Sequence, residues 1–299
     1  MLARLLEGDS PVDVVGVVTQ PDKPVGRKQT LAPPPVKVLA GRREIPVLQP
    51  VSLRRPASVA ALARFSPDVG IVAAYGKILR PDVLQLPRHG HLNVHASLLP
   101  RWRGAWPVGA AILAGDDVSG VSIMRLDEGM DTGPVLAEHR EPIRPNDTTE
   151  TLERRLAALG AGLLVETLPA YLAGELKPQP QDDARATYCH VVSKSEGQID
   201  WSQPAAQIER HVRAMTPWPG SFTTWEGKQL RIVRARAAEG VASGAAPGTV
   251  VRHDGGAAVV TGDGRLLLEE VQLEGKKAMP IQALLNGYRT FVGSRLGAG

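Results

Sequence analysis

The stretch VDVVGVVT at residues 12–19 decides the fold class, because it is apolar on both faces of an extended chain. Residues 69–73 (VGIVA) and residues 92–94 (LNV) repeat this short apolar pattern. Stretches with helical spacing occur between and after them, at residues 58–65 and 107–114. Buried strands that alternate with helices are typical of a parallel sheet covered by helices. We therefore predict an α/β first domain with a Rossmann-like, open and mostly parallel sheet.

The character of the sequence changes after Gly174. The segment KPQPQDD that soon follows is polar and holds two prolines, which is typical of a linker. We therefore predict a first domain over residues 1–176, a linker over residues 177–193 and a second domain over residues 194–299.

The second predicted domain carries several short strand patterns with glycine-rich turns between them. Helix patterns lie on either side of these strands, at residues 205–215 and 281–292. The strand patterns occupy residues 230–236, 249–253, 257–261 and 266–273. Several short strands within about a hundred residues favour a small β-barrel, here of the OB-like kind.

Composition limits the class of protein. The 299 residues carry a net charge of +4, which is weak support for a polyanionic partner. Cys189 is the single cysteine, so the chain can form neither an internal disulfide nor a cysteine-rich metal site, as is usual in a reducing compartment. No uninterrupted apolar run reaches the ~20 residues that span a bilayer, and the N-terminus does not resemble a signal peptide. We expect a cytoplasmic protein that binds no membrane.

The densest cluster of candidate site residues lies in HLNVHASLLPRWRGA, at residues 91–105. Asn93 and His95 are two positions apart at the end of a predicted strand, so their side chains face the same side of the sheet. Ligand crevices form at the ends of parallel strands in open α/β sheets. An amide donor beside an imidazole can stabilise an oxyanion, so this pair is a candidate catalytic site.

A second cluster lies in GVSIMRLDEGMDTGPVL, at residues 120–136, where a predicted strand runs into a loop. Gly129 and Gly133 bracket Asp131 and would let the backbone approach a flat ligand closely. Asp131 is then a candidate carboxylate facing the amide and the imidazole. We expect no metal, because no cysteine lies near these residues. The sequence holds no glycine-rich nucleotide fingerprint, P-loop or GxSxG elbow, which argues against dehydrogenases, ATPases and hydrolases.

Together, NVHASLLPRWRG at residues 93–104 and LDEGMDTGPVL at residues 126–136 closely resemble the folate-dependent formyltransferases. In that family an Asn, a His and an Asp carry the reaction, and they fall on Asn93, His95 and Asp131. The resemblance implies 10-formyltetrahydrofolate as cosubstrate and an amine that attacks its formyl carbon, without a metal. Asn93 and His95 would then stabilise the oxyanion, while Asp131 would hold the imidazole and help relay a proton.

The resemblance also implies which residues line the folate site. The SLLP segment matches one wall of that site, and the AAYG segment resembles another. The implied folate-binding residues are Ser97, Leu98, Leu99, Pro100, Ala74, Tyr75, Gly76, Gly129 and Gly133.

Three features resemble the branch of this family that formylates methionyl initiator tRNA for translation initiation. The basic stretch QPDKPVGRK at residues 20–28 resembles the loop that meets the acceptor arm, and two later segments resemble parts of a C-terminal tRNA-binding domain. These two segments are SKSEGQIDW at residues 193–201 and GKKAM at residues 275–279. The implied tRNA-binding residues are Lys23, Arg27, Lys28, Arg101 and Arg103.

Other functions stay open from the sequence. The same Asn-His-Asp core serves relatives that formylate a small amine, such as a nucleotide amino-sugar or a purine precursor. The basic loop and the C-terminal β domain favour tRNA over these amines. A non-catalytic RNA-binding relative is the alternative outside the enzymes, and the intact core argues against it. A monomer is expected.

The start of the chain departs from the family. The family opens with a short strand, a Gly-Thr-Pro loop and a helix, whereas this sequence begins with MLARLL, which resembles the end of that helix. The first strand and its loop are therefore expected to be absent, and residues 12–19 would lack one neighbouring strand. Buried backbone groups without a partner cost about 1–3 kcal/mol each, so we expect a form extended upstream to be more stable and more active.

Overall fold

The computed structural model describes residues 1–25, 29–240 and 244–297, which form two compact units. The first unit consists of Met1–Ala105, Ser119–Glu141 and Arg154–Cys189. The second unit consists of Trp106–Val118, Pro142–Glu153 and His190–Gly299. Both sequence motifs that carry the candidate catalytic residues therefore lie in the first unit.

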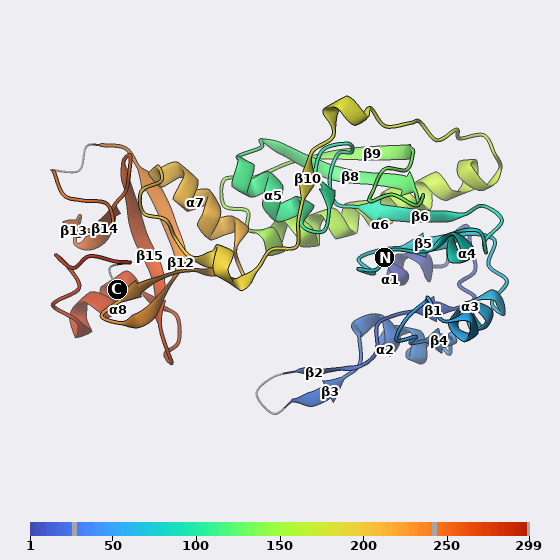
Figure 1. Ribbon diagram of the computed structural model, residues 1–299, viewed down its shortest axis with the longest axis horizontal. Helices are drawn as coiled ribbons and strands as arrows, with labels where there is room; N and C mark the ends of the chain where they lie inside the picture. Colours follow the sequence, from blue (N-terminus) through green and yellow to red (C-terminus); the bar gives the residue numbers. More distant parts are fainter. Residues whose placement is uncertain (26–28, 241–243, 298–299) are drawn as a thin grey trace. The chain divides into compact units, whose positions relative to one another are not determined.

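A four-stranded sheet forms the centre of the first unit (Figure 1). Its strand order is β5 (Gly70–Val72), β6 (His91–His95), β8 (Val118–Arg125) and β9 (Val135–Pro142). β5 and β6 are parallel, which confirms the predicted α/β class with a parallel core. β8 runs antiparallel to β6, with His95 opposite Ser122.

A second, two-stranded sheet lies apart from this one. It pairs β1 (Val17–Val18) in parallel with β4 (Val47–Leu48). Only these two residues of the strand predicted at 12–19 are in a strand. The backbone N–H groups of Val17 and Thr19 donate toward β4, so the intervening residue Val18 faces the opposite edge. Among the described strands no neighbour pairs with that edge.

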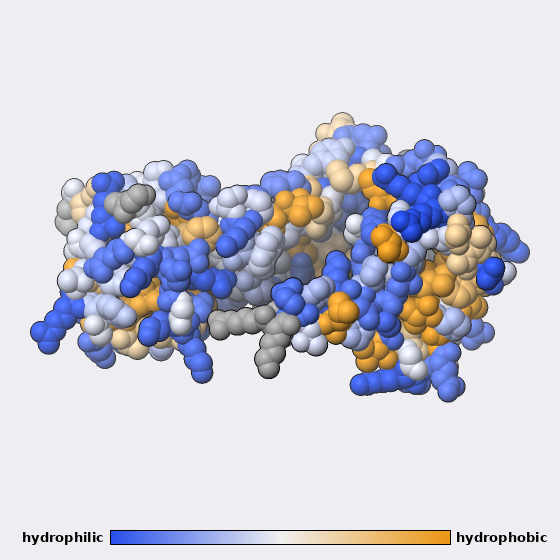
Figure 2. All heavy atoms as spheres, turned by 60° about the horizontal axis from the view of Figure 1, so that its bottom comes forward, coloured by the Kyte–Doolittle hydropathy of each residue, from blue (hydrophilic) through white to orange (hydrophobic). Residues whose placement is uncertain are grey.

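A cavity of about 590 Å³ separates the two sheets. Residues of both β1 and β5 line it, and most of its walls are aliphatic. Neither facing edge has a partner among the described strands, and toward β4 the backbone N–H groups that donate are those of Val17 and Thr19. Hydrophobic surface is visible on this unit in Figure 2. The exposed large hydrophobic residues of the unit include Val25, Leu31 and Ile78.

The remaining elements of the first unit are short. Three of its helices, α2, α3 and α4, begin with a proline, whose fixed φ suits the first helical turn. These elements are α1 (Leu2–Leu5), β2 (Lys23–Val25), β3 (Thr30–Ala32), α2 (Pro35–Arg42), α3 (Pro56–Ala63), α4 (Pro81–Leu84), β7 (Arg103–Gly104), η1 (Asp183–Arg185) and β10 (Tyr188–Cys189).

The longest helix, α6 (Thr149–Leu172), begins in the second unit and continues in the first. By length and composition alone it could cross a membrane. Leu152, Leu156, Leu164 and Leu168, however, are at most 1% exposed. This apolar face is thus covered by protein, as in a core helix.

The second unit contains the predicted antiparallel β domain. Its strands pair in the order β11-β12-β15-β14-β13, and β16 adds to β15. β11, with the alternating sequence SFTTW, was missed in the sequence, and α8 ends five residues before the predicted end at residue 292. The elements are α5 (Pro107–Ala114), η2 (Lys194–Gly197), α7 (Ala205–Ala214), β11 (Ser221–Trp225), β12 (Lys228–Ala238), β13 (Val250–His253), β14 (Gly256–Val260), β15 (Arg265–Leu273), β16 (Met279–Pro280) and α8 (Ile281–Gly287).

Candidate active site

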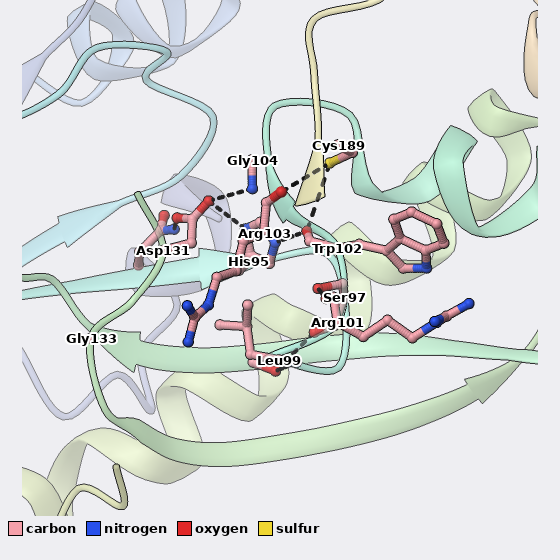
Figure 3. Close-up of polar contacts among 12 residues, drawn as sticks. His95, Ser97, Leu99, Arg101, Trp102, Arg103, Gly104, Asp131, Gly133 and Cys189 are labelled. Carbon is pink, nitrogen blue, oxygen red and sulfur yellow. Dashed lines mark hydrogen bonds and ion pairs between the residues drawn. The ribbon is translucent and has the colours of Figure 1, made fainter. Parts of the chain in front are cut away.

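Asn93, His95 and Asp131 meet at the end of β6. Asn93 and His95 are on β6 itself, and Asp131 lies in the loop between β8 and β9. Asn93 Nδ2 donates to Asp131 Oδ1 over 3.5 Å, and His95 Nδ1 lies 3.7 Å from Asp131 Oδ2. Alternation along β6 puts the amide and the imidazole on one side of the sheet, where the carboxylate approaches both. Figure 3 shows the His95 ring and the Asp131 carboxylate pointing toward one another.

A backbone carbonyl fixes the protonation of the buried His95 ring. His95 is 6% exposed, and its Nε2 lies 2.9 Å from the carbonyl oxygen of Trp102. A carbonyl only accepts, so Nε2 carries a proton. Nδ1, the other nitrogen of the ring, faces the Asp131 carboxylate.

Asp131 is held in a strained backbone conformation. Its φ of +55° lies in the left-handed region, which is uncommon for a residue other than glycine. Its Oδ2 accepts a 2.9 Å hydrogen bond from the backbone N–H of Gly104 (Figure 3). Only glycine fits at Gly104, because a Cβ there would lie 2.1 Å from the carbonyl oxygen of Cys189. The amide that binds the carboxylate therefore depends on close packing of two chain segments.

The loop after β6 is tied together internally. Ser97 is 1% exposed, and its hydroxyl donates to the Arg101 carbonyl over 2.6 Å. The backbone N–H of Leu99 donates to the hydroxyl of Ser122 on β8. The Ser97 hydroxyl therefore donates within the loop and not to a ligand. Ser97 would then contribute to a folate-binding wall by shaping the loop.

The residues expected to line the folate site lie on separate features of the structure. Ala74 and Tyr75, which follow β5, line the 590 Å³ cavity, but none of the SLLP residues 97–100 and none of the three candidate catalytic residues does. Ala74 and Gly76 both have positive φ, so the chain turns sharply there. The Tyr75 hydroxyl is buried without a hydrogen-bond partner among the described residues, and burial raises its pKa.

The two glycines expected at the folate site, Gly129 and Gly133, lie on either side of Asp131 in the loop between β8 and β9. The backbone N–H of Gly129 donates to the Asp127 carboxylate over 3.0 Å. A Cβ on Gly133 would lie 1.9 Å from the carbonyl oxygen of Arg125, so this glycine is required for the loop to fold back on β8. Both glycines therefore shape the loop that presents Asp131.

The expected tRNA-binding residues divide into three cases. Lys23 on β2 and Arg101 are exposed, and Arg101 stacks 4.6 Å over the Trp102 ring. Arg27 and Lys28 lie outside the described residues. Arg103 requires a correction, because it is 1% exposed and donates to the side chains of Gln181, Asp183 and Tyr188. A guanidinium buried among protein partners cannot reach an RNA phosphate.

Sequence reasoning missed Gln181 and the backbone groups that complete the site. Gln181 lies in the segment predicted as a linker, whose polar, proline-containing composition gave no sign of tertiary contacts. The Trp102 carbonyl and the Gly104 N–H contact the candidate catalytic side chains, but backbone groups carry no signal in a sequence. Among residues 1–25, 29–240 and 244–297, no three His, Cys, Asp or Glu side chains cluster as metal ligands.

Comparison with known proteins identifies the class. The family described as formyl transferase matches residues 1–168, and its C-terminal domain matches residues 191–289. The chain therefore belongs to the formyl transferase family. It is 51% identical to methionyl-tRNA formyltransferase of Roseiflexus castenholzii over 296 residues, which cover 99% of this chain and 94% of the relative. It is also 51% identical to methionyl-tRNA formyltransferase of Myxococcus xanthus, covering 95% of this chain and 90% of that one.

Solved structures of lower identity share the fold. HypX from Aquifex aeolicus in complex with tetrahydrofolic acid has a TM-score of 0.63 at 20% identity, over 94% of this chain and 48% of HypX. An N-formyltransferase from Helicobacter canadensis with folinic acid and dTDP-3-aminofucose has a TM-score of 0.65 at 16% identity, over 89% of this chain and 93% of that one. These likenesses bear out the α/β domain followed by a β domain.

Proposed function

We propose that this chain transfers the formyl group of 10-formyltetrahydrofolate to the α-amine of methionyl initiator tRNA, for translation initiation. The observation that carries the proposal is the convergence of Asn93, His95 and Asp131 in a chain 51% identical to two methionyl-tRNA formyltransferases. Folate relatives supply the cosubstrate class, since tetrahydrofolic acid and folinic acid are bound to proteins of this fold.

The geometry suits attack of a neutral amine on the formyl carbon. A new C–N bond forms, and the formyl carbonyl oxygen becomes an oxyanion, to which an Asn93 N–H can donate. The amine must lose a proton, and Asp131, whose Oδ2 lies 3.7 Å from the His95 ring, can help to accept or relay it. The proton is returned to N10 of the folate as the C–N10 bond breaks, so the reaction is balanced without a metal.

The tRNA is proposed to contact both units. Lys23 and Arg101 are exposed in the first unit, and Arg27 and Lys28 belong to the same basic loop in the sequence. Exposed cations of this kind bind the phosphates of a nucleic acid. The β domain of the second unit would hold more of the tRNA. We propose that the protein acts in the cytoplasm, without membrane attachment and as a monomer.

The test is a formyl-transfer assay on the purified chain. Incubation with 10-formyltetrahydrofolate and methionyl-tRNA should yield formylmethionyl-tRNA, and a nucleotide amino-sugar offered in place of the tRNA should remain unmodified. Transfer to the amino-sugar but not to the tRNA would favour the small-amine enzymes. Binding of methionyl-tRNA with no transfer to either acceptor would favour a non-catalytic relative.

A further inference from the structure

The segment predicted as a linker runs along both loops of the candidate active site. At one end Gln179 and Val135 exchange two backbone hydrogen bonds, of 2.7 and 2.8 Å. At the other end β10 (Tyr188–Cys189) pairs in parallel with β7 (Arg103–Gly104). We call residues 179–189 the strap. It connects the loop that carries Asp131 with the loop that carries Trp102 and Gly104.

Gln181 is the side chain of the strap that reaches the Asp131 loop. Its Nε2 donates to the backbone carbonyls of Asp131 and Gly133, over 2.9 and 2.6 Å. Its Oε1 accepts from Nε and Nη2 of Arg103, over 3.0 and 2.8 Å. Both donors and both acceptor positions of the amide are thus occupied, which defines the orientation of the side chain.

The buried Arg103 anchors this glutamine. The guanidinium also donates to Asp183 and Tyr188, over 2.7 and 3.2 Å. The Asp183 side chain is 82% exposed, so water screens its ion pair with Arg103. A buried guanidinium needs hydrogen-bond partners, and the Gln181 amide oxygen supplies two of its contacts. Arg103 is therefore placed to hold Gln181 against the Asp131 loop.

Asp131 needs such support because its backbone is strained. A left-handed conformation at a residue other than glycine persists only where the surroundings hold it, and such residues cluster at functional sites. Two groups hold Asp131: the Gly104 N–H binds its carboxylate, and the Gln181 side chain donates to its backbone carbonyl. Both groups come from the strap or from the loop paired with it.

We propose that Gln181 is a positioning residue for the formyl transfer. By holding the carbonyls of Asp131 and Gly133, it keeps the Asp131 carboxylate within reach of Asn93 and His95. The inference rests on the proposed function, in which Asp131 acts beside His95. Gln181 itself touches neither His95 nor Asn93 among the contacts of the described residues, so its effect must pass through Asp131.

The first experiment is Gln181→Glu. The substitution keeps the shape and the oxygen that accepts from Arg103, but it replaces the donor with an oxygen that repels the two carbonyls. We expect kcat to fall about 10- to 100-fold, the scale of a catalytic group displaced by roughly 1 Å, while KM for both substrates stays nearly unchanged. Gln179→Glu is the matched control, because its side chain donates to the Lys177 carbonyl instead, and it should keep the wild-type kcat.

A double variant separates positioning from general support of the fold. In an Asp131→Asn background, single-turnover rates should fall no further when Gln181→Glu is added, because the two residues act in series. The inference would be overturned if Gln181→Glu lowered the single-turnover rate of Asp131→Asn by the same factor as that of the wild-type chain. A wild-type kcat in Gln181→Glu alone would also overturn it. If Gln181→Glu does not fold, Gln181→Ala tests the same point without an added charge. Absence of formyl transfer by the wild-type chain would instead count against the proposed function.

Discussion

At the scale of residues, a single carboxylate organises the candidate site. Asp131 contacts the Asn93 amide and the His95 ring, and it accepts the Gly104 N–H. One oxygen therefore faces Nδ1 of His95, while the other accepts from the Asn93 amide. Chemistry that depends on such an arrangement is sensitive to the loss of any one member.

Alanine at any of the three candidate catalytic positions should therefore stop most turnover. We expect Asn93→Ala, His95→Ala and Asp131→Ala each to lower kcat by ~10²-fold or more, with the fold retained. Formyl transfer to methionyl-tRNA measures the effect, and circular dichroism checks the fold. His139→Ala, a partly exposed histidine of β9 in the same unit, is the control. Near-normal turnover in one variant removes that residue from the mechanism.

At the scale of elements, the divided sheet of the first unit is the main departure from an ordinary α/β domain. Among the strands that the structure describes, β1 and β5 each pair on one edge, and an apolar cavity lies between them. β6, by contrast, is paired with β5 on one side and with β8 on the other. The backbone amides of β6 should be better protected from hydrogen exchange than those of β1 and β5, because local opening is easiest where hydrogen bonds are few.

Amide hydrogen exchange tests the divided sheet. The N–H groups of Val18 and Ile71 face the unpaired edges, so we expect them to exchange much faster than those of Leu92 and Val94 on β6. Exchange measured residue by residue by NMR on the full chain gives the comparison directly. Protection of Val18 and Ile71 equal to that of β6 would mean that another strand pairs with these edges in solution.

His211, on helix α7, should make the stability of the second unit depend on pH. His211 on this helix is partly buried, and its loss of solvation lowers the pKa of this histidine below its ordinary 6.5. The unfolded chain then binds more protons than the folded chain as the pH falls through 6.5. The stabilisation is complete above this pH and is lost as the pH drops through the lower folded-state pKa.

Urea unfolding between pH 7.5 and pH 5, at about half-unit steps, measures this effect. The free energy of unfolding of the wild-type chain should decrease toward acid, and His211→Gln should flatten part of that decrease. The slope with pH is the observable, because the substitution also changes packing. Wild-type and variant curves that stay parallel over this range would contradict the assignment to His211. His91, whose pKa burial also lowers, contributes in the same direction from the first unit.

At the scale of the whole molecule, each of the two compact units is built from three separate segments of the sequence. The second unit includes α5 and the first turn of α6 together with the C-terminal β domain. Val108, Ala111 and Ile112 of α5 are each 1% exposed, and α5 packs against α7, so removal of the chain from residue 194 onward would uncover part of α5. The contribution of the β domain to tRNA binding is therefore best tested by surface substitutions in the full chain.

Binding of methionyl-tRNA should depend steeply on salt. Each phosphate contact made by a lysine or arginine releases counterions, so affinity falls as salt rises. We expect Lys23→Ala to weaken binding and to reduce the log–log salt slope by about one unit, with folate binding unchanged. Filter binding or fluorescence titration at several salt concentrations measures both quantities. An affinity that is flat between low and physiological salt would contradict an electrostatic interface.

The sequence by itself determined the α/β class, the antiparallel β domain and the pair on β6. Leu92 and Val94 are the apolar positions of this strand, and the period of two in a strand puts Asn93 and His95 together on the other side whatever surrounds them. α5 matches the predicted residues 107–114 for a similar reason, because helical spacing is a local property. Patterns of this kind act over a few residues and need no knowledge of distant parts of the chain.

Tertiary structure decided everything that depends on which segments meet. Arginine is a residue type that often contacts nucleic-acid phosphates, so the sequence alone suggests that role for Arg103. In the structure, Arg103 is buried and donates a hydrogen bond to Gln181 of the strap. The strap itself is polar and proline-containing like a linker, yet its backbone pairs with β7 and with Val135. β1 is likewise short although residues 12–19 have a strand-like sequence, and in the described part of the chain it pairs with β4 alone. Long-range hydrogen bonds join residues up to 87 positions apart here, and no local pattern encodes such partners.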